Sequence, residues 1–265
     1  MKHTQTNDTP EKFIEENANK KKPASGRPQP LILNDASPFL IREAYKTTRA
    51  NINFALGAKE GCRCFAITSS VATEGKTTTS INIAITFAQA NAKVLLIDAD
   101  MRKSSVHKYL GIKNSTGLSN VLSGFTQLNE VIKKTPHGFD CMTAGPTPPN
   151  PAELLMAQPC KDLISTLSQF YDYIIIDTPP VGVVSDILAI TDIIDGIIVT
   201  VRERFTTHDQ LEKTIAALQF AGAKILGFIL NDASGSDGTY RYRYRYKYNN
   251  KKGYDYGYDS YDNYY

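Results

Sequence analysis

A glycine, a lysine and two threonines stand where a short apolar run gives way to a helical one, in a segment suited to binding phosphate. The apolar run ends near Thr68, and the loop continues through Ser70, Val71, Ala72, Thr73, Glu74, Gly75, Lys76, Thr77 and Thr78. In a strand, loop and helix of this kind, backbone N–H groups and the helix N-terminus face phosphate oxygens. We expect Lys76 to reach the β- and γ-oxygens of ATP, and the Thr77 hydroxyl to bind Mg²⁺.

One residue of this loop departs from the pattern G-x-x-x-x-G-K-S/T, because Ser70 stands at the first glycine position. Serine tolerates a positive φ poorly, so the entry of the loop is expected to differ in shape. A chance Gly-Lys-Thr helix start is the alternative interpretation, and other residues must decide between the two.

Three carboxylates follow two further apolar runs and complete the candidate site. Asp98 and Asp100 come after Val94–Ile97, and Asp177 comes after Tyr173–Ile176. Ligands of open α/β sheets bind at the carboxyl ends of the strands, where these acids would meet. Burying them together requires a cation, which Mg²⁺ with ATP supplies. Each motif alone is also compatible with a solvated turn after a buried strand, but their combination with the loop favours a functional site at Lys76, Asp98, Asp100 and Asp177.

The elements that position these residues alternate between strand and helix. Apolar or β-branched runs predict strands at 64–68, 94–97, 173–176, 197–201 and 225–230, and helical patterns cover 77–90, 161–170, 185–194 and 206–221. Near-continuous apolar strands separated by helices are typical of a parallel sheet covered on both faces. The fold class predicted is a doubly wound, mostly parallel α/β domain of the P-loop NTPase type. A helix is expected to lead into it, with Ser37 as N-cap and Pro38 at its first position.

Both ends of the chain differ in composition from this domain. Residues 1–36 are polar and lack periodic apolar positions, which predicts a flexible N-terminal arm, and residues 37–233 form the expected catalytic domain. Residues 234–265 begin with a Gly/Ser linker and contain all but four of the 15 tyrosines. These are Tyr240, Tyr242, Tyr244, Tyr246, Tyr248, Tyr254, Tyr256, Tyr258, Tyr261, Tyr264 and Tyr265.

Charge, cysteines and hydropathy narrow the class of protein. The formal net charge of +3 is too small to predict nucleic-acid binding from composition alone. The four cysteines do not have the spacing of a zinc site. The arginines interleaved with Tyr240–Tyr248 suggest single-stranded nucleic acid as an alternative, but the acids that follow disfavour it. With no apolar signal region and no run long enough to span a bilayer, we expect a soluble cytoplasmic protein.

These residues together resemble the bacterial tyrosine kinases of capsule and exopolysaccharide operons, over roughly residues 37–265. The loop resembles their Walker A motif, Asp98-Ala99-Asp100-Met101-Arg102 their D-x-D-x-R motif, and Ile176-Asp177-Thr178-Pro179-Pro180 their Walker B motif. The resemblance implies an ATP-dependent protein-tyrosine kinase that autophosphorylates its tyrosine-rich end and regulates polysaccharide synthesis and export. It implies that Lys76 and Thr77 bind nucleotide and Mg²⁺, and that Asp98 and Asp177 support the metal. It also makes Asp100 the candidate for orienting or deprotonating the acceptor phenol. Arg102 would orient Asp100 or contact a neighbour, and Asn231 would contact the adenine edge or end a strand.

The same resemblance implies partners. The family's E-x-x-R-x-x-R helix, which holds subunits in a ring, is matched by Glu43, Lys46 and Arg49, with lysine at the middle position. Lysine lacks the planar fork of arginine, so a bidentate contact there would be weaker. A separate transmembrane activator would recruit the kinase to the inner face of the membrane, and a cognate phosphatase and other protein substrates are expected.

Two other functions share this fold. A regulatory ATPase of the septum-site and plasmid-partition kind usually carries a lysine early in the loop, where this chain has Val71. A nucleotide-bound scaffold of the polysaccharide machinery is the other alternative, and the reaction product distinguishes them from a kinase.

Overall fold

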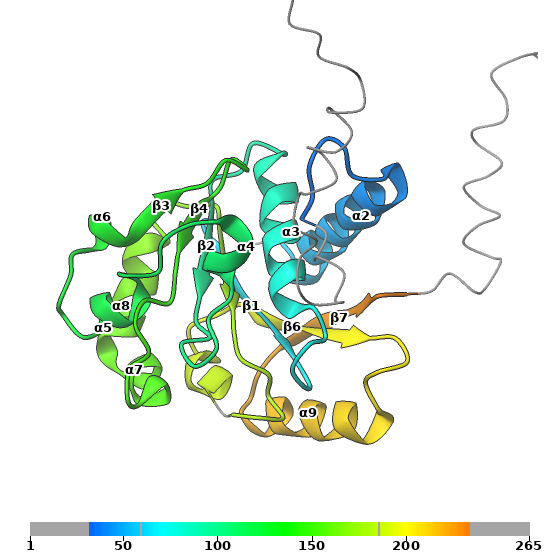
Figure 1. Ribbon diagram of the computed structural model, residues 1–265. Coiled ribbons are helices and arrows are strands. Elements are labelled where there is room, and N and C mark those ends of the chain that lie inside the picture. Colours follow the sequence, from blue (N-terminus) through cyan, green and yellow to red (C-terminus); the bar gives the residue numbers. More distant parts are fainter. Residues whose placement is uncertain (1–31, 59, 185, 234–265) are drawn as a thin grey trace, which may run out of the picture. The chain divides into compact units, whose positions relative to one another are not determined.

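The structure is a computed structural model, and it describes residues 32–58, 60–184 and 186–233 (Figure 1). The predicted N-terminal arm, except for residues 32–36, and all the tyrosines of the C-terminal segment lie outside the described residues. No helix in this described part is long and apolar enough to cross a membrane.

The described residues form a seven-stranded sheet with the order β3-β4-β2-β5-β1-β6-β7. Only β3 runs antiparallel to its neighbour, at one edge of the sheet, and the other neighbouring strands pair in parallel. The strands are β1 (Arg63–Ser69), β2 (Val94–Asp98), β3 (Ile132–Lys134), β4 (Asp140–Met142), β5 (Tyr173–Asp177), β6 (Gly196–Arg202) and β7 (Ile225–Asn231).

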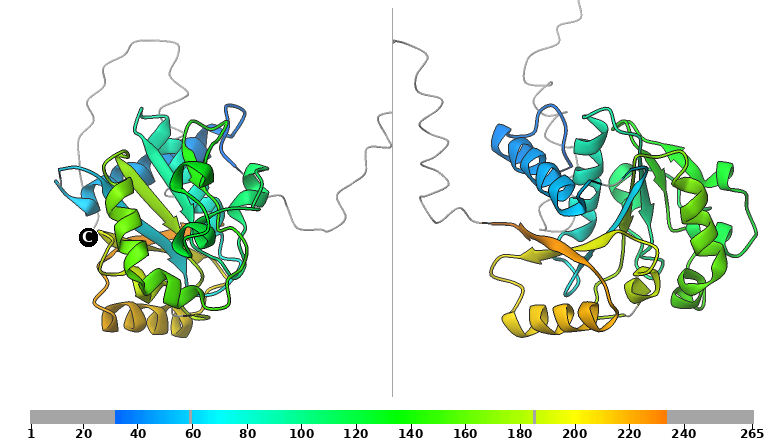
Figure 2. Two further views of the ribbon diagram at one scale, coloured as in Figure 1. Left: turned by 90° about the vertical axis from the view of Figure 1, so that its left-hand side faces the viewer. Right: turned by 180° about the vertical axis from the view of Figure 1, so that it is seen from behind.

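Helices cover both faces of this sheet, as the two views of Figure 2 show. One face carries α2 (Phe39–Leu56), α3 (Lys76–Ala88) and α4 (Val106–Leu110), whose apolar residues share one buried cluster. The other face carries α5 (Leu118–Leu122), α6 (Leu128–Val131), α7 (Pro151–Met156), α8 (Gln158–Leu167), the 3₁₀ helix η1 (Asp186–Ile190) and α9 (His208–Phe220). The prediction of a doubly wound, mostly parallel sheet is confirmed.

The strand β1 illustrates why the central strands are apolar along their whole length. Phe65 and Ile67 pack in the cluster beneath α2 and α3, while Cys64 and Ala66 pack in the cluster on the opposite face. Successive side chains of a strand point to opposite faces, so a strand covered on both sides needs apolar residues at every position.

Several predicted elements differ from the observed ones. The helix α2 begins at Phe39 with Pro38 at the cap, because the Ser37 hydroxyl instead accepts the N–H of Asn34 at 2.9 Å. The predicted helix over 185–194 is a 3₁₀ turn over Asp186–Ile190, in which Ile187 and Ile190 both reach the core. Side chains three apart align in a 3₁₀ helix, which explains this choice. The three-residue strands β3 and β4 were not predicted, since they are too short to show a pattern.

The folded part begins earlier than residue 37. Leu33 is buried against the cluster beneath α2, and its N–H donates to the Asn82 side chain at 2.9 Å. Residues 32–36, which the composition placed in the N-terminal arm, therefore contact the domain.

Candidate functional site

The register of the central strands brings two of the predicted acids side by side. Asp98 at the end of β2 is the direct partner of Asp177 at the end of β5. Asp177 is also paired with Ile67 of β1, the strand that leads into the Ser70–Lys76 loop. Parallel strands end at the same edge of a sheet, so the loop and both carboxylates share one edge.

Lys76 joins this edge from the first turn of α3. Its Nζ lies 3.0 Å from Asp100 Oδ2 and 3.6 Å from Asp177 Oδ2. All these side chains are buried, with Lys76 9% exposed and Asp98 0% exposed. The structure therefore brings together the four residues that the sequence singled out for catalysis.

Hydroxyl groups of α3 hold the Asp177 carboxylate in place. Thr77 Oγ1 donates to Asp177 Oδ2 at 2.7 Å, and Ser80 Oγ donates to Asp177 Oδ1 at 3.0 Å. Thr77 Oγ1 also lies 3.0 Å from Ser105 Oγ. Residues three apart share a helix face, so the spacing of Thr77 and Ser80 was a signal that the sequence analysis did not use.

Backbone amides hold the other two carboxylates. Asp98 Oδ2 accepts the N–H groups of Ser105 and Val106, both at 3.2 Å, and Asp98 Oδ1 accepts that of Asp100 at 3.2 Å. Asp100 Oδ1 accepts the N–H of Lys103 at 2.9 Å. The backbone of the segment after β2 thus donates hydrogen bonds to the carboxylates of Asp98 and Asp100. Ser105 and Val106 carry no recognisable motif and were missed.

This site places three carboxyl groups around one lysine. Burial raises the pKa of Asp98 to about 8, and the neighbouring charge of Asp177 adds to that rise. Burial likewise raises the pKa of Asp177, although Lys76 opposes the shift. Burial alone would lower the pKa of Lys76, but the charges of Asp177 and Asp100 outweigh it and raise that pKa. One lysine facing three buried acids leaves a need for further cationic charge.

The phosphate-loop backbone adopts positive φ at Thr73 (70°) and Gly75 (89°), while Ser70 is not among the described residues with positive φ. Ser70 therefore avoids the left-handed backbone that serine tolerates poorly. Its carbonyl instead accepts the N–H of Gly182 at 3.0 Å, and a Cβ at Gly182 would lie 2.4 Å from that oxygen. The sequence analysis did not identify Gly182, where the backbone passes close to that of Ser70.

Two polar side chains brace the same loop from within. Glu74 is fully buried, and its carboxylate accepts the N–H of Val71 at 2.9 Å and the hydroxyl of Thr206. Asn231 Nδ2 donates to the Glu74 carbonyl at 2.9 Å and would lie 2.0 Å from a Cβ at Gly75. The structure therefore brings Asn231 to the loop backbone, and Gly75 leaves the room that the Asn231 amide fills.

The residues present suit a magnesium nucleotide. The excess negative charge and the adjacent Thr77 hydroxyl and Asp177 carboxylate fit a hard cation bound by few protein ligands plus phosphate oxygens. Within the described ranges, no three His, Cys, Asp or Glu side chains are grouped to hold a metal ion on their own. The Ser70 hydroxyl is buried and has no hydrogen-bond partner among the residues described, so it remains available to a bound molecule.

The residues predicted for oligomerisation lie on α2, where two of the three contact each other. Lys46 Nζ lies 2.7 Å from Glu43 Oε1 on the exposed surface. Arg49 donates to the carbonyl of Thr86 on α3. Thus Arg49 anchors α2 to its own domain, while Glu43 and Lys46 face outward as an ordinary i,i+3 pair.

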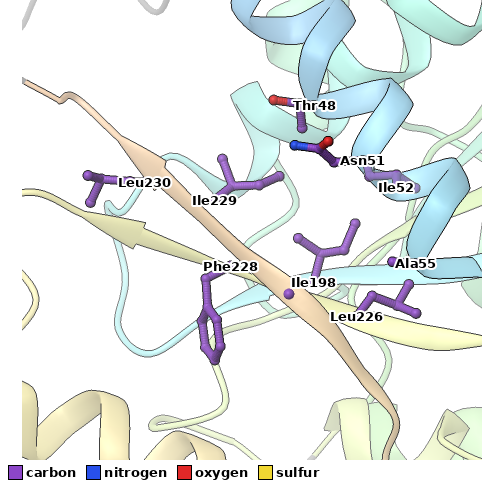
Figure 3. Close-up of a pocket in the computed structure, with 10 residues that line it drawn as sticks. Thr48, Asn51, Ile52, Ala55, Ile198, Leu226, Phe228, Ile229 and Leu230 are labelled. Atoms are coloured by element: carbon purple, nitrogen blue, oxygen red, sulfur yellow. The ribbon is translucent and has the colours of Figure 1, made fainter. Parts of the chain in front are cut away.

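A groove lies elsewhere, between α2 and β7, and Figure 3 shows its lining. Asn51 and Ala55 line it from α2, and Leu226 and Ile229 line it from β7. None of the four converging residues contributes to this groove. The candidate site is thus defined by the buried lysine and acids and not by this hollow.

Comparisons with known proteins agree with this geometry. Residues 63–226 match the family model described as AAA domain. The chain is 36% identical over 203 residues to the putative tyrosine-protein kinase CapB of Staphylococcus aureus, covering 76% of this chain and 89% of that protein. It is 38% identical over 193 residues to the tyrosine-protein kinase YwqD of Bacillus subtilis strain 168, covering 72% and 81%. The solved kinase domain of the Escherichia coli tyrosine kinase ETK matches with a TM-score of 0.72 and 30% identity, over 94% of this chain and 91% of that one.

Proposed function

This chain belongs to the bacterial P-loop tyrosine kinases, and from that premise we propose that it transfers the γ-phosphate of ATP to tyrosine hydroxyls, including those of its own residues 234–265. The protein is a tyrosine kinase by its relatives. The observation that carries the proposal is the convergence of Lys76 with Asp98, Asp100 and Asp177 at the phosphate loop.

Lys76 and the loop backbone would bind the polyphosphate. The Lys76 ammonium is buried and lies at the N-terminus of α3, where a helix dipole also favours anions. Thr77, Asp177 and Asp98 would hold Mg²⁺, which when bound neutralises phosphate charge. Residues 70–78 and Asn231 would surround the nucleotide, since Asn231 already contacts the loop.

Asp100 would accept the proton of the acceptor tyrosine. In the transfer, the phenol oxygen forms a bond to the γ-phosphorus, the bond from that phosphorus to the ADP oxygen breaks, and the phenolic proton passes to the Asp100 carboxylate. Asp100 suits this role better than Asp98, because Asp98 accepts three backbone N–H groups whereas Asp100 is held by Lys76 and one N–H. When Lys76 turns to phosphate, Asp100 Oδ2 loses its contact with the ammonium and is open to the phenolic proton.

The tyrosines from Tyr240 to Tyr265 are the proposed acceptors in cis or in a neighbouring subunit. They follow β7 after a Gly/Ser linker, and β7 ends at Asn231 beside the phosphate loop. Each phosphate adds about −1.5 to −2 charges at neutral pH, which would disfavour close packing of subunits. We therefore infer a cycle in which modification loosens an oligomer built on α2. Lys46 offers that oligomer a weaker contact than arginine would.

We also propose the cellular setting from the relatives. The kinase would act at the inner face of the membrane beside a transmembrane activator and regulate capsular or extracellular polysaccharide synthesis and export. A cognate phosphatase would reset the tyrosines. The chain would divide into an N-terminal arm, a kinase domain that ends near residue 233 and an acceptor segment over residues 234–265.

The test uses the full chain with ATP, Mg²⁺ and a fragment of the membrane partner, and mass spectrometry of the products. We expect phosphotyrosine in residues 234–265 of the wild type and none in Lys76→Met. Lys213→Met is the matched control, because Lys213 pairs with Asp209 on the exposed surface of α9. Equal phosphotyrosine in Lys76→Met and wild type would refute the proposal. Release of free phosphate without phosphotyrosine would favour a regulatory ATPase instead.

A further inference from the structure

An ion pair outside the converging four joins the two loops that carry the acids. Arg102 Nε lies 2.8 Å from Asp186 Oδ2, and an Arg102 Nη lies 3.1 Å from Asp186 Oδ1. This is a two-point fork between a guanidinium and a carboxylate. Asp186 is 1% exposed at the start of η1, downstream of β5, and Arg102 follows β2.

Arg102 contacts one carboxylate, that of Asp186, and feels the charge of a second, that of Asp100. It is two residues after Asp100 in the chain, and its pKa is raised chiefly by the hydrogen bonds to Asp186, with a contribution from the charge of Asp100. Among the described residues, Asp100 forms its ion pair with Lys76, and Arg102 forms its ion pair with Asp186.

This division of partners bears on the proton acceptor. An arginine remains charged throughout the pH range of the reaction and binds a carboxylate through a rigid fork. If the fork of Arg102 closed on Asp100, it would occupy the oxygen atoms that must receive the phenolic proton. Lys76 differs, because bound polyphosphate offers it a stronger anionic partner than one carboxylate.

We propose that Asp186 is a positioning residue for phosphoryl transfer, which keeps the Arg102 guanidinium away from Asp100 so that Asp100 can accept the proton. Arg102 also immediately precedes Lys103, whose N–H donates to Asp100 Oδ1 at 2.9 Å, so the fork holds the segment that contacts Asp100. The inference rests on the proposed function, since it assigns Asp100 the role of base. It adds a residue that carries none of the kinase motifs.

The first test is Asp186→Asn in the full chain, assayed for phosphotyrosine in residues 234–265 with ATP, Mg²⁺ and the fragment of the membrane partner. Asparagine keeps the shape and one acceptor but releases the second N–H of the fork. We expect kcat to fall about 10- to 100-fold, part of the about 10²- to 10⁴-fold that a positioned base contributes, because the released guanidinium would occupy Asp100 oxygens, with KM for ATP unchanged. Thermal unfolding of the nucleotide-free proteins is measured in parallel, because Asp186 is buried.

The decisive test is rescue by a second substitution. In Asp186→Asn/Arg102→Gln the released cation is gone, so kcat should return to within about threefold of wild type, an energy difference below about 1 kcal/mol. In Asp186→Asn/Arg102→Lys the cation remains, and kcat should stay low. If the ion pair only stabilises the fold, the Gln double variant should be no more active than Asp186→Asn, because removing the second partner cannot restore the lost contact.

Each outcome has a defined meaning. A wild-type kcat in Asp186→Asn, or a Gln double variant no more active than the single one, overturns the positioning role while the kinase itself stands. A wild type that makes no phosphotyrosine overturns the proposed function and this role with it. If Asp186→Asn unfolds at the assay temperature, the comparison of the two double variants decides, since equal activity in both refutes the role.

Discussion

Replacing Asp98 by asparagine should change how the stability of the nucleotide-free protein depends on pH. Asp98 is buried beside Asp177, and its pKa rises from 3.8 to about 8. The folded state therefore holds the Asp98 proton more tightly than the unfolded state does. Such a group stabilises the fold below the unfolded pKa, and that contribution is lost as the pH rises towards the folded pKa.

The magnitude follows from the size of this shift. One proton costs about 1.4 kcal/mol of unfolding free energy per pH unit, so from pH 5 to pH 8 the wild type should lose up to about 4 kcal/mol through this carboxyl. The Asp98→Asn substitution removes that loss, because an amide does not ionise in this range. The amide accepts fewer of the three backbone N–H groups that Asp98 now accepts, which costs about 1 kcal/mol at every pH. Between its unfolded pKa of 3.8 and pH 5 the Asp98 carboxyl has already cost the wild type about 1.6 kcal/mol, so the two proteins should be of similar stability at pH 5, and the variant should be the more stable by about 4 kcal/mol at pH 8.

Urea unfolding of the full chain at pH 5, 6, 7 and 8, without nucleotide or Mg²⁺, measures both curves. Asp172→Asn is the matched control, because Asp172 precedes β5 at the opposite end of that strand, is exposed, and accepts the N–H of Lys93 at 2.7 Å. The control should follow the wild-type curve. Parallel curves for Asp98→Asn and wild type would show that Asp98 is ionised at pH 5 and would refute the account of the site's charge.

Three further predictions concern the same loop, the base and the outward face of α2. Gly75→Ala should lose nucleotide binding, measured by calorimetry, because the alanine Cβ would lie 2.0 Å from Asn231 Nδ2 and the φ of residue 75 is 89°. Adding Asn231→Gly should restore only part of the nucleotide affinity, since the backbone strain of about 1 kcal/mol remains. Asp100→Asn should lower kcat about 10²- to 10⁴-fold with little change in KM for ATP, and a kcat within about threefold of wild type would assign the base elsewhere. Lys46→Arg should raise the sedimenting mass of the unphosphorylated protein if α2 forms the subunit contact, and an unchanged mass would remove α2 from that role.

The sequence by itself was enough to predict the central strands of the sheet and the residues of the candidate site. The apolar runs before Asp98 and Asp177 are long enough to identify central strands, because a strand buried on both faces admits few polar residues. The spacing of Gly75, Lys76 and Thr77 identified the phosphate loop, since a loop that presents its backbone to an anion needs those residue types. Local pattern sufficed wherever neighbours along the chain set the structure.

Only the tertiary structure decided which residues form ion pairs and hydrogen bonds with each other. Whether Arg102 would meet Asp100 or another partner was open, and Asp186, 84 residues along the chain, takes it. Asn231 donates to the carbonyl of Glu74, 157 positions earlier in the chain. Thr206 donates to the Glu74 carboxylate from 132 positions away. Such contacts depend on strand order and register, which place distant segments at one edge of the sheet and leave no mark in the residues nearby.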